Sequence, residues 1–332
     1  MKAPKVVSLF SGCGGSSLGY KMAGCRVIAA VEFVDFQAEN YRRNYPGVRV
    51  YEQDIRTLEP KTVLSDLGLR PGELDILDGS PPCAAFTLSG DREKTWGKIV
   101  NYSNRKQRTD DLFFEYVRFV RGVRPKMFVA ENVKGLTIGV ARGMLNEFLA
   151  AFEKCGYDVQ AKVLDAANYS VPQHRKRVLI VGTRKDLGLR FEYPEPHARR
   201  VTVADAIGKM KNSAKDLAEI GKRRGMVHGV MLGRKPGENA ADVIGEGFSY
   251  RRLDWLRPSS TIVSNDANQL YHPKEDRNLT IREAKMICGF PESFVLTGDY
   301  RERFEALARA VPPPLMAAMA GRAIECLRGG RR

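Results

Sequence analysis

The stretch Lys5-Val6-Val7-Ser8-Leu9-Phe10-Ser11-Gly12-Cys13-Gly14-Gly15-Ser16-Ser17-Leu18-Gly19 decides how this chain folds. Its apolar start, residues 5–10, predicts a buried strand, and the small residues 11–17 predict a tight turn that opens a helix. Glycines in such a turn let the backbone approach a ligand closely. The loop alone does not identify that ligand, because similar loops bind NAD, other nucleotides and S-adenosylmethionine.

Working outward from this stretch, strands and helices alternate through the first half of the chain. Further strands are predicted at residues 26–32, 74–77, 127–130 and 177–182, and helices at residues 112–123 and 143–155. This alternation predicts an α/β fold with a doubly wound, parallel, Rossmann-like sheet and right-handed crossovers. The alternation ends near residue 185, so the sequence predicts a first domain at 1–185, a smaller irregular domain at 186–256 and a returning segment at 257–332 that ends in a helix.

The composition is that of a globular protein with an excess of positive charge. The 332 residues are 43% apolar, and 54 Lys and Arg against 39 Asp and Glu give a net charge of +15. The charge is concentrated in residues 84–109 and 199–235, and the second stretch has ten basic against three acidic residues. This distribution favours a polyanionic partner lying in a groove, although a merely basic soluble protein has a similar composition.

Several protein classes are excluded by the same composition. The chain has no long uncharged apolar run and no secretory signal at its start, so we expect a cytoplasmic protein without a membrane span. Its six cysteines are scattered and never form a Cys-x-x-Cys pair, which argues against a disulfide framework and against structural zinc. No metal is expected.

Acidic residues follow successive predicted strands. Glu32 ends the second strand, where a carboxylate could accept hydrogen bonds from ribose hydroxyls, and Asp54 follows a third predicted strand. Each acid alone is more simply read as an ordinary loop residue. Their order on neighbouring strand ends of one sheet favours a cofactor that contains a nucleoside.

A second set of residues suggests covalent chemistry. Cys83 follows Ser80-Pro81-Pro82 just beyond a strand, and the two prolines would hold a nucleophile in a fixed position. Glu131-Asn132-Val133 ends a later strand and adds a carboxylic acid to the same row. Gln173, Arg175 and Arg177 alternate at the start of a further strand and are expected to share one face.

Taken together, these residues resemble the DNA cytosine-5 methyltransferase family. The resemblance continues through Arg257-Pro258-Ser259-Ser260-Thr261-Ile262 and Ala310-Val311-Pro312-Pro313, and it leaves only about residues 186–254 unmatched. The unmatched part corresponds to the variable target-recognition region of the family. The resemblance implies a monomeric enzyme of the restriction-modification type, bacterial or phage-encoded, that acts on double-stranded DNA with S-adenosyl-L-methionine.

The resemblance also assigns roles to individual residues. The catalytic residues would be Cys83, which attacks C6 of a flipped-out cytosine, with Glu131 at N3 and Arg177 and Arg175 at O2. Pro82, Asn132 and Gln173 would contact the substrate. The cofactor contacts would be Phe10, Ser11, Gly12, Cys13, Gly14, Gly15, Glu32, Asp54, Ile55, Pro81, Leu112, Arg309, Ala310 and Val311.

Three positions depart from the family pattern. Ala84 replaces a glutamine after the nucleophile, and Thr87 replaces a serine, as it does in relatives that modify transfer RNA. Arg309 stands where the family has an asparagine near the transferring group. A cation there would be offset either by a DNA phosphate or protein carboxylate, or by an anion on the transferring group itself. The second solution predicts carboxy-S-adenosyl-L-methionine as cofactor and 5-carboxymethylcytosine as product.

Other functions remain open at this stage. The chemistry could act on transfer RNA, because charge does not separate RNA from DNA. A catalytically silent DNA-binding homologue would tolerate Ala84 and Arg309, but it has no need of Cys83, Glu131 and Arg177 together. A dehydrogenase is permitted by the glycine loop, yet nothing in the sequence supplies hydride chemistry.

Overall fold

The computed structural model describes residues 2–82, 100–102, 105–107, 111–139, 141–220, 230–239, 250–263 and 270–329. The chain forms two compact units. The first contains Met1–Leu164, Lys176–Glu195 and Met316–Arg332, and the second contains Asp165–Arg175 and Pro196–Leu315. The division by function at residues 185 and 256 stays a prediction.

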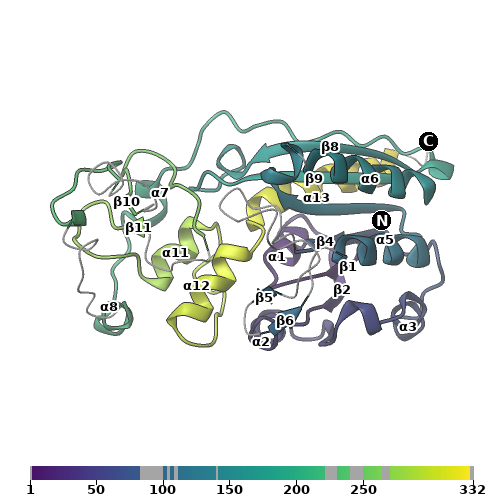
Figure 1. The fold of residues 1–332 in the computed structure, drawn as a ribbon, viewed down its shortest axis with the longest axis horizontal. Helices are drawn as coiled ribbons and strands as arrows, with labels where there is room; N and C mark the ends of the chain where they lie inside the picture. The colour runs from purple at the N-terminus through teal and green to yellow at the C-terminus, as the bar shows by residue number, and fades with distance from the viewer. Residues whose placement is uncertain are drawn as a thin grey trace. The chain divides into compact units, whose positions relative to one another are not determined.

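The first unit is built on a seven-stranded sheet in the order β3-β2-β1-β4-β7-β9-β8 (Figure 1). Its strands are β1 (Lys5–Leu9), β2 (Arg26–Val31), β3 (Arg49–Tyr51), β4 (Ile76–Gly79), β7 (Met127–Val133), β8 (Tyr157–Asp165) and β9 (Lys176–Arg184). A separate two-stranded sheet is formed by β5 (Val100–Tyr102) and β6 (Arg105–Gln107). The helices of this unit are α1 (Gly15–Met22), α2 (Asp35–Asn44), α3 (Pro60–Asp66), α5 (Leu112–Val123), α6 (Ala141–Lys154) and, from Met316 on, α13 (Pro313–Gly329), with short 3-10 turns η1 (Ile55–Thr57), η3 (Lys134–Thr137) and η5 (Lys185–Leu187).

The predicted α/β sheet is confirmed, but the prediction that it is parallel throughout is wrong at one strand. The pairs β1–β2, β1–β4, β2–β3 and β4–β7 are parallel, whereas β9 runs antiparallel to β7. Strand β8, which precedes β9 and takes the edge position, was not predicted. The reason is physical: most β8 side chains between Asp158 and Val163 are exposed or half-buried, so this edge strand lacks the apolar run that marks a central one.

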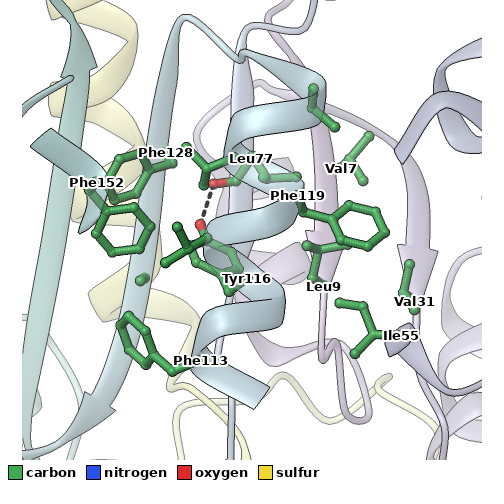
Figure 2. Close-up of a cluster of buried hydrophobic side chains, with 14 of the residues drawn as sticks. Val7, Leu9, Val31, Ile55, Leu77, Phe113, Tyr116, Phe119, Phe128 and Phe152 are labelled. Atoms are coloured by element: carbon green, nitrogen blue, oxygen red, sulfur yellow. Dashed lines mark hydrogen bonds between the residues drawn. The ribbon is translucent and has the colours of Figure 1, made fainter. Parts of the chain in front are cut away.

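The two faces of the sheet are buried by different helices. Val7 and Leu9 of β1 and Leu77 of β4 lie in a core with α3, α5 and α6. Figure 2 shows this face, with Tyr116 and Phe119 of α5 directed at the strands, while Phe113 stacks on Phe148 of α6 with the ring centroids 3.8 Å apart. The alternate residues Ser8 and Asp78 lie on the other face, where Asp78 contacts α1. Helices on both faces make the fold doubly wound.

Tyr116 joins α5 to the sheet and gives a first testable prediction. Its fully buried hydroxyl lies 2.9 Å from the carbonyl of Leu77 and 3.0 Å from that of Val129, on the neighbouring strands β4 and β7. Tyr116→Phe leaves both carbonyls without this donor, so we expect it to lower the free energy of unfolding by about 1–2 kcal/mol. Urea unfolding measures the change, and an unaltered midpoint would contradict it.

The second unit is composed of short elements. Its helices are α7 (Val203–Ile207), α8 (Ala214–Glu219), α11 (Ile281–Ile287), α12 (Tyr300–Arg309) and the start of α13 (Pro313–Gly329), with the 3-10 turn η4 (Ala166–Asn168) and the paired strands β10 (Arg251–Arg252) and β11 (Leu270–Tyr271). Capping boxes begin four of the helices, at Thr202, Ser213, Thr280 and Asp299. Local caps of this kind help to define short helices that have little core of their own.

Candidate active site

The glycine loop between β1 and α1 has the conformation that its composition predicts. Phe10 and Gly12 have φ values of 53° and 54°, and Gly14 has φ 97°. A Cβ atom on Gly14 would lie 2.3 Å from the ring of Tyr45, so only glycine fits there. A Cβ atom on Gly12 would meet no atom within 4 Å, which shows that this part of the loop borders open space.

Glu32 holds the loop at the end of β2. One carboxylate oxygen accepts a hydrogen bond from the Gly12 amide at 2.7 Å, and the other accepts from Phe33 and Val34 at 2.9 and 2.8 Å. Ser11 is fixed as well, because its hydroxyl donates to the carbonyl of Ser8 at 2.8 Å. Glu32 therefore orders the loop, a role that the sequence analysis did not foresee.

Asp54 lies beside a cation that the sequence analysis overlooked. It caps η1 by accepting from the Arg56 amide, and the Arg56 guanidinium bridges Asp54 and Asp111 at 3.0 and 2.6 Å. Hydrogen bonding to Asp111 raises the pKa of Arg56 above its usual value. Ile55 and Leu112 are buried in the core of the first unit, and their predicted contact with an adenine stays a prediction.

The segment that leads to the predicted nucleophile is tied to β7. The Asn132 side chain donates to the carbonyl of Pro81 at 3.2 Å and accepts from the amide of Val133. Pro81 is buried and Pro82 is half-buried. Cys83, like Ala84 and Thr87, lies outside the described residues. The Asn132 side chain thus fixes the position of Pro81, two residues before Cys83. The predicted contact of Asn132 with the substrate stays a prediction.

Glu131 and Arg177 form a buried ion pair. In the antiparallel register of β7 and β9, Val133 pairs with Arg177 and Glu131 pairs with Leu179, so the two charged residues are diagonal neighbours on one face. Arg177 Nε lies 2.8 Å from Glu131 Oε1, and their side chains are 13% and 9% exposed. Burial lowers the pKa of Arg177, while the Glu131 carboxylate acts in the opposite direction.

Strand β9 begins at Lys176, so Gln173 and Arg175 precede the strand that carries Arg177, and the expectation that the three side chains share one face stays a prediction. Both belong to the second unit. Gln173 is fully buried, bridges to Ser259 and donates to the sulfur of Cys288 at 3.5 Å. Arg175 is buried, and its guanidinium donates to the carbonyl of Ile262. These contacts join residues 172–175 to residues 259–262, two segments that carried the family resemblance.

Arg309 ends helix α12 in the second unit. Its guanidinium lies 3.0 Å from the carboxylate of Glu305, one turn earlier on the helix. Ala310 follows as the C-cap, and Val311 is buried. A protein carboxylate is one of the two solutions expected for the charge at Arg309.

Three of the other cysteines are poorly suited to nucleophilic chemistry. Burial raises the pKa of Cys25 to about 12, and of Cys288 and Cys326 to about 11. The thiolate is the reactive form, so these side chains are inert near neutral pH. Cys13 is buried within the glycine loop.

Part of the basic stretch at residues 199–235 is described. Arg199 pairs with Asp205 at 2.8 Å, Arg200 donates to Asn168, and Arg234 lies 3.8 Å from Glu238. Arg199 remains 81% exposed. The cluster Lys222-Arg223-Arg224 lies outside the described residues.

Comparison with known proteins identifies the family of this chain. The sequence profile of C-5 cytosine-specific DNA methylases matches residues 4–325. The chain belongs to this family. It is 33% identical over 328 residues to the type II methyltransferase M1.HphI of Haemophilus parahaemolyticus, a match that covers 95% of this chain and 85% of the relative. It is 34% identical to M.NgoFVII of Neisseria gonorrhoeae, over 93% of this chain and 83% of the relative.

Solved structures of methyltransferases have the same fold. A protein encoded within an E. coli prophage, described as a DNA modification methyltransferase, superposes with a TM-score of 0.78 at 22% identity, covering 98% of this chain and all of the other. DNMT2 of Spodoptera frugiperda superposes with a TM-score of 0.71 at 18% identity, covering 97% and 100%. The chain is a DNA cytosine-5 methyltransferase. None of the helices in the described part of the chain is long and apolar enough to span a membrane.

Proposed function

We propose that this methyltransferase transfers the methyl group of S-adenosyl-L-methionine to C5 of a cytosine flipped out of duplex DNA, with Cys83 as the covalent nucleophile. The observation that carries the proposal is the hydrogen bond from Asn132 to the Pro81 carbonyl. It ties the segment before Cys83 to the strand that holds Glu131 and, through the ion pair, Arg177. Pro81, which precedes Cys83 by two residues, is thereby bonded to the strand that carries Glu131.

The residues divide the chemistry between them. The C5 and C6 atoms of cytosine are inaccessible inside the stacked duplex, so the base must leave the helix. The Cys83 thiolate forms a bond to C6. A proton donated by the Glu131 carboxyl group to N3 and hydrogen bonds from the Arg177 guanidinium to O2 stabilise the negative charge that develops on the ring. After C5 has been alkylated, a base removes the C5 proton, the electron pair re-forms the C5–C6 double bond, and the C6–S bond breaks to release Cys83.

The glycine loop and its neighbours fit an adenosyl cofactor. The loop borders open space at Gly12, and the Glu32 carboxylate beside it is a suitable acceptor for ribose hydroxyls. Phe10 would stack near the adenine and Asp54 would accept from its amine. S-adenosyl-L-methionine, when bound, supplies a methyl group on a positively charged sulfur.

The ion pair at Arg309 favours the unmodified cofactor. The alternative, carboxy-S-adenosyl-L-methionine, was suggested by the need for an anion beside Arg309. Glu305 already provides one within the same helix. We therefore assign Arg309 a role in the protein rather than on the transferring group, and 5-methylcytosine as the product.

The second unit would bind the target. The basic stretch at residues 199–235 supplies exposed cations such as Arg199 for the phosphate backbone, and residues 186–256 would read the sequence. Backbone contacts of this kind weaken steeply as salt concentration rises.

Nucleoside mass analysis tests the proposed product. Purified protein is incubated with duplex DNA or transfer RNA and with equal amounts of the two cofactors, and the digested nucleosides are weighed. We expect 5-methylcytosine from DNA only, for the wild type and for Arg309→Asn alike. A 5-carboxymethylcytosine product that disappears in Arg309→Asn would favour the alternative cofactor, and product from transfer RNA alone would overturn the DNA assignment.

A further inference from the structure

A buried carboxyl group at the end of β4 has no place in the chemistry above. Asp78 is 1% exposed and lies directly opposite Ser8 in the register of β1 and β4. Its Oδ2 accepts hydrogen bonds from the hydroxyls of Ser8 and Ser16, each at 2.8 Å. One oxygen atom thus connects β1, β4 and the first turn of α1.

These three elements flank two segments of the proposed active site: the glycine loop, residues 10–15, and residues 79–82, which lead to Cys83. Ser8 stands two residues before Phe10 and Ser16 directly after Gly15, so they flank the glycine loop. Asp78 stands five residues before Cys83, in the strand from which the nucleophile segment departs. The Ser80 amide also donates to the carbonyl of Leu9, so the two strand ends are bonded beyond Asp78.

Helix α1 has no acidic residue near its N-terminus, where a negative charge would stabilise it. No acidic residue lies in its first turn, and its N-cap, Gly14, makes no side-chain cap. The N-terminus of a helix carries partial positive charge and is stabilised by a nearby anion. Asp78 supplies that anion from the neighbouring strand through Ser16.

We propose that Asp78 is a positioning residue. Its ionised carboxylate holds the glycine loop, residues 10–15, in a fixed position relative to residues 79–82, which lead to Cys83. The inference rests on the proposed assignment of these loops to cofactor and nucleophile. The sequence signal was an acidic residue inside the buried strand Ile76–Gly79, which the sequence analysis passed over.

The charge state of Asp78 gives this role a pH dependence. Burial raises the pKa of Asp78 to about 7, hydrogen bonds from Ser16 and Ser8 lower it, and the charge of Glu131 raises it. The buried hydroxyl groups of Tyr20, Tyr41 and Tyr116 also interact electrostatically with the carboxyl group. As pH falls through about 7, Asp78 takes up a proton and becomes a weaker acceptor for both hydroxyls.

Hydrogen exchange on the cofactor-free protein tests the positioning directly. The amides of Gly12 and Gly14 donate to Glu32 and to the carbonyl of Ser11, so they are protected when the loop is ordered. In Asp78→Asn we expect peptides covering residues 11–17 and 76–80 to exchange about tenfold faster than in the wild type. Ser17→Ala is the matched control, because its hydroxyl bonds Tyr41 instead. Equal exchange in Asp78→Asn and the wild type would overturn the proposal.

Binding of S-adenosylhomocysteine, measured by calorimetry from pH 6 to 8, gives a second readout. Wild-type affinity should rise with pH, and Asp78→Asn should bind about tenfold more weakly with no such rise. Ser16→Ala removes a bond that lowers the pKa of Asp78, so its midpoint should move to higher pH, whereas that of Ser17→Ala should not. The comparison of Ser16→Ala with Ser17→Ala tests the inference even if Asp78→Asn does not fold. If the pH midpoint of binding by Ser16→Ala equals that of the wild type, the inference is refuted.

The two proposals fail in different ways. A wild type that binds no S-adenosylhomocysteine or forms no adduct with 5-fluorocytosine DNA would contradict the proposed function, while the exchange measurement would still report on Asp78. Unchanged exchange in a fully active Asp78→Asn would contradict this inference alone.

Discussion

Cys83→Ser is expected to abolish the covalent complex with duplex DNA that contains 5-fluorocytosine and to slow methyl transfer at least about a thousandfold. A serine hydroxyl has a far higher pKa than a thiol, so it is not ionised near neutral pH. Fluorine at C5 cannot leave as a proton, so elimination is blocked and the C6–S bond formed by the wild type survives denaturation. The adduct is measured on a denaturing gel.

A matched control distinguishes loss of the nucleophile from general damage. Cys155 is half-buried at the edge of the core of the first unit and is not among the predicted site residues. Cys155→Ser should form the adduct like the wild type. Cys83→Ser should still bind duplex DNA, and an adduct formed by Cys83→Ser would assign the chemistry to another residue.

The ion pair between Glu131 and Arg177 is expected to give the second largest effect. Glu131→Gln should slow single-turnover methyl transfer by about 10²–10⁴-fold, because an amide at N3 cannot transfer the proton that the reaction needs. Arg177→Gln leaves the Glu131 carboxylate buried without its partner, so it should also lower the free energy of unfolding by about 3–5 kcal/mol. Rapid-quench kinetics and urea unfolding measure the two effects.

An exposed pair of the same residue types provides the comparison. Glu39 and Arg43 lie 2.7 Å apart on α2 with side chains 44% and 57% exposed. Glu39→Gln should change stability by less than about 1 kcal/mol and leave the rate unaltered. The roles assigned to the buried pair would be wrong if Glu131→Gln transferred methyl groups at the wild-type rate.

Much of the first unit was predictable because its central strands are buried on both faces. Apolar runs in residues 5–10 and 127–130 have no stable alternative to such strands, and the helix at residues 112–123 was predicted with the bounds that α5 has. The strand β8 and the antiparallel direction of β9 were not predictable in this way. An edge strand with polar side chains has no periodic signal, and strand direction depends on where the chain returns to the sheet.

The sequence by itself determined the family, the order of the chemical residues and the tight turn at Gly12 and Gly14, because these depend on residue type and local backbone conformation. Only the tertiary structure decided which charges meet. It paired Arg177 with Glu131, and Asp78 with Ser8 and Ser16. It also gave Arg175 a partner in the carbonyl of Ile262, 87 residues further along the chain. This ion pair and these buried hydrogen bonds join segments that are distant in the sequence, so the local residue pattern does not determine them.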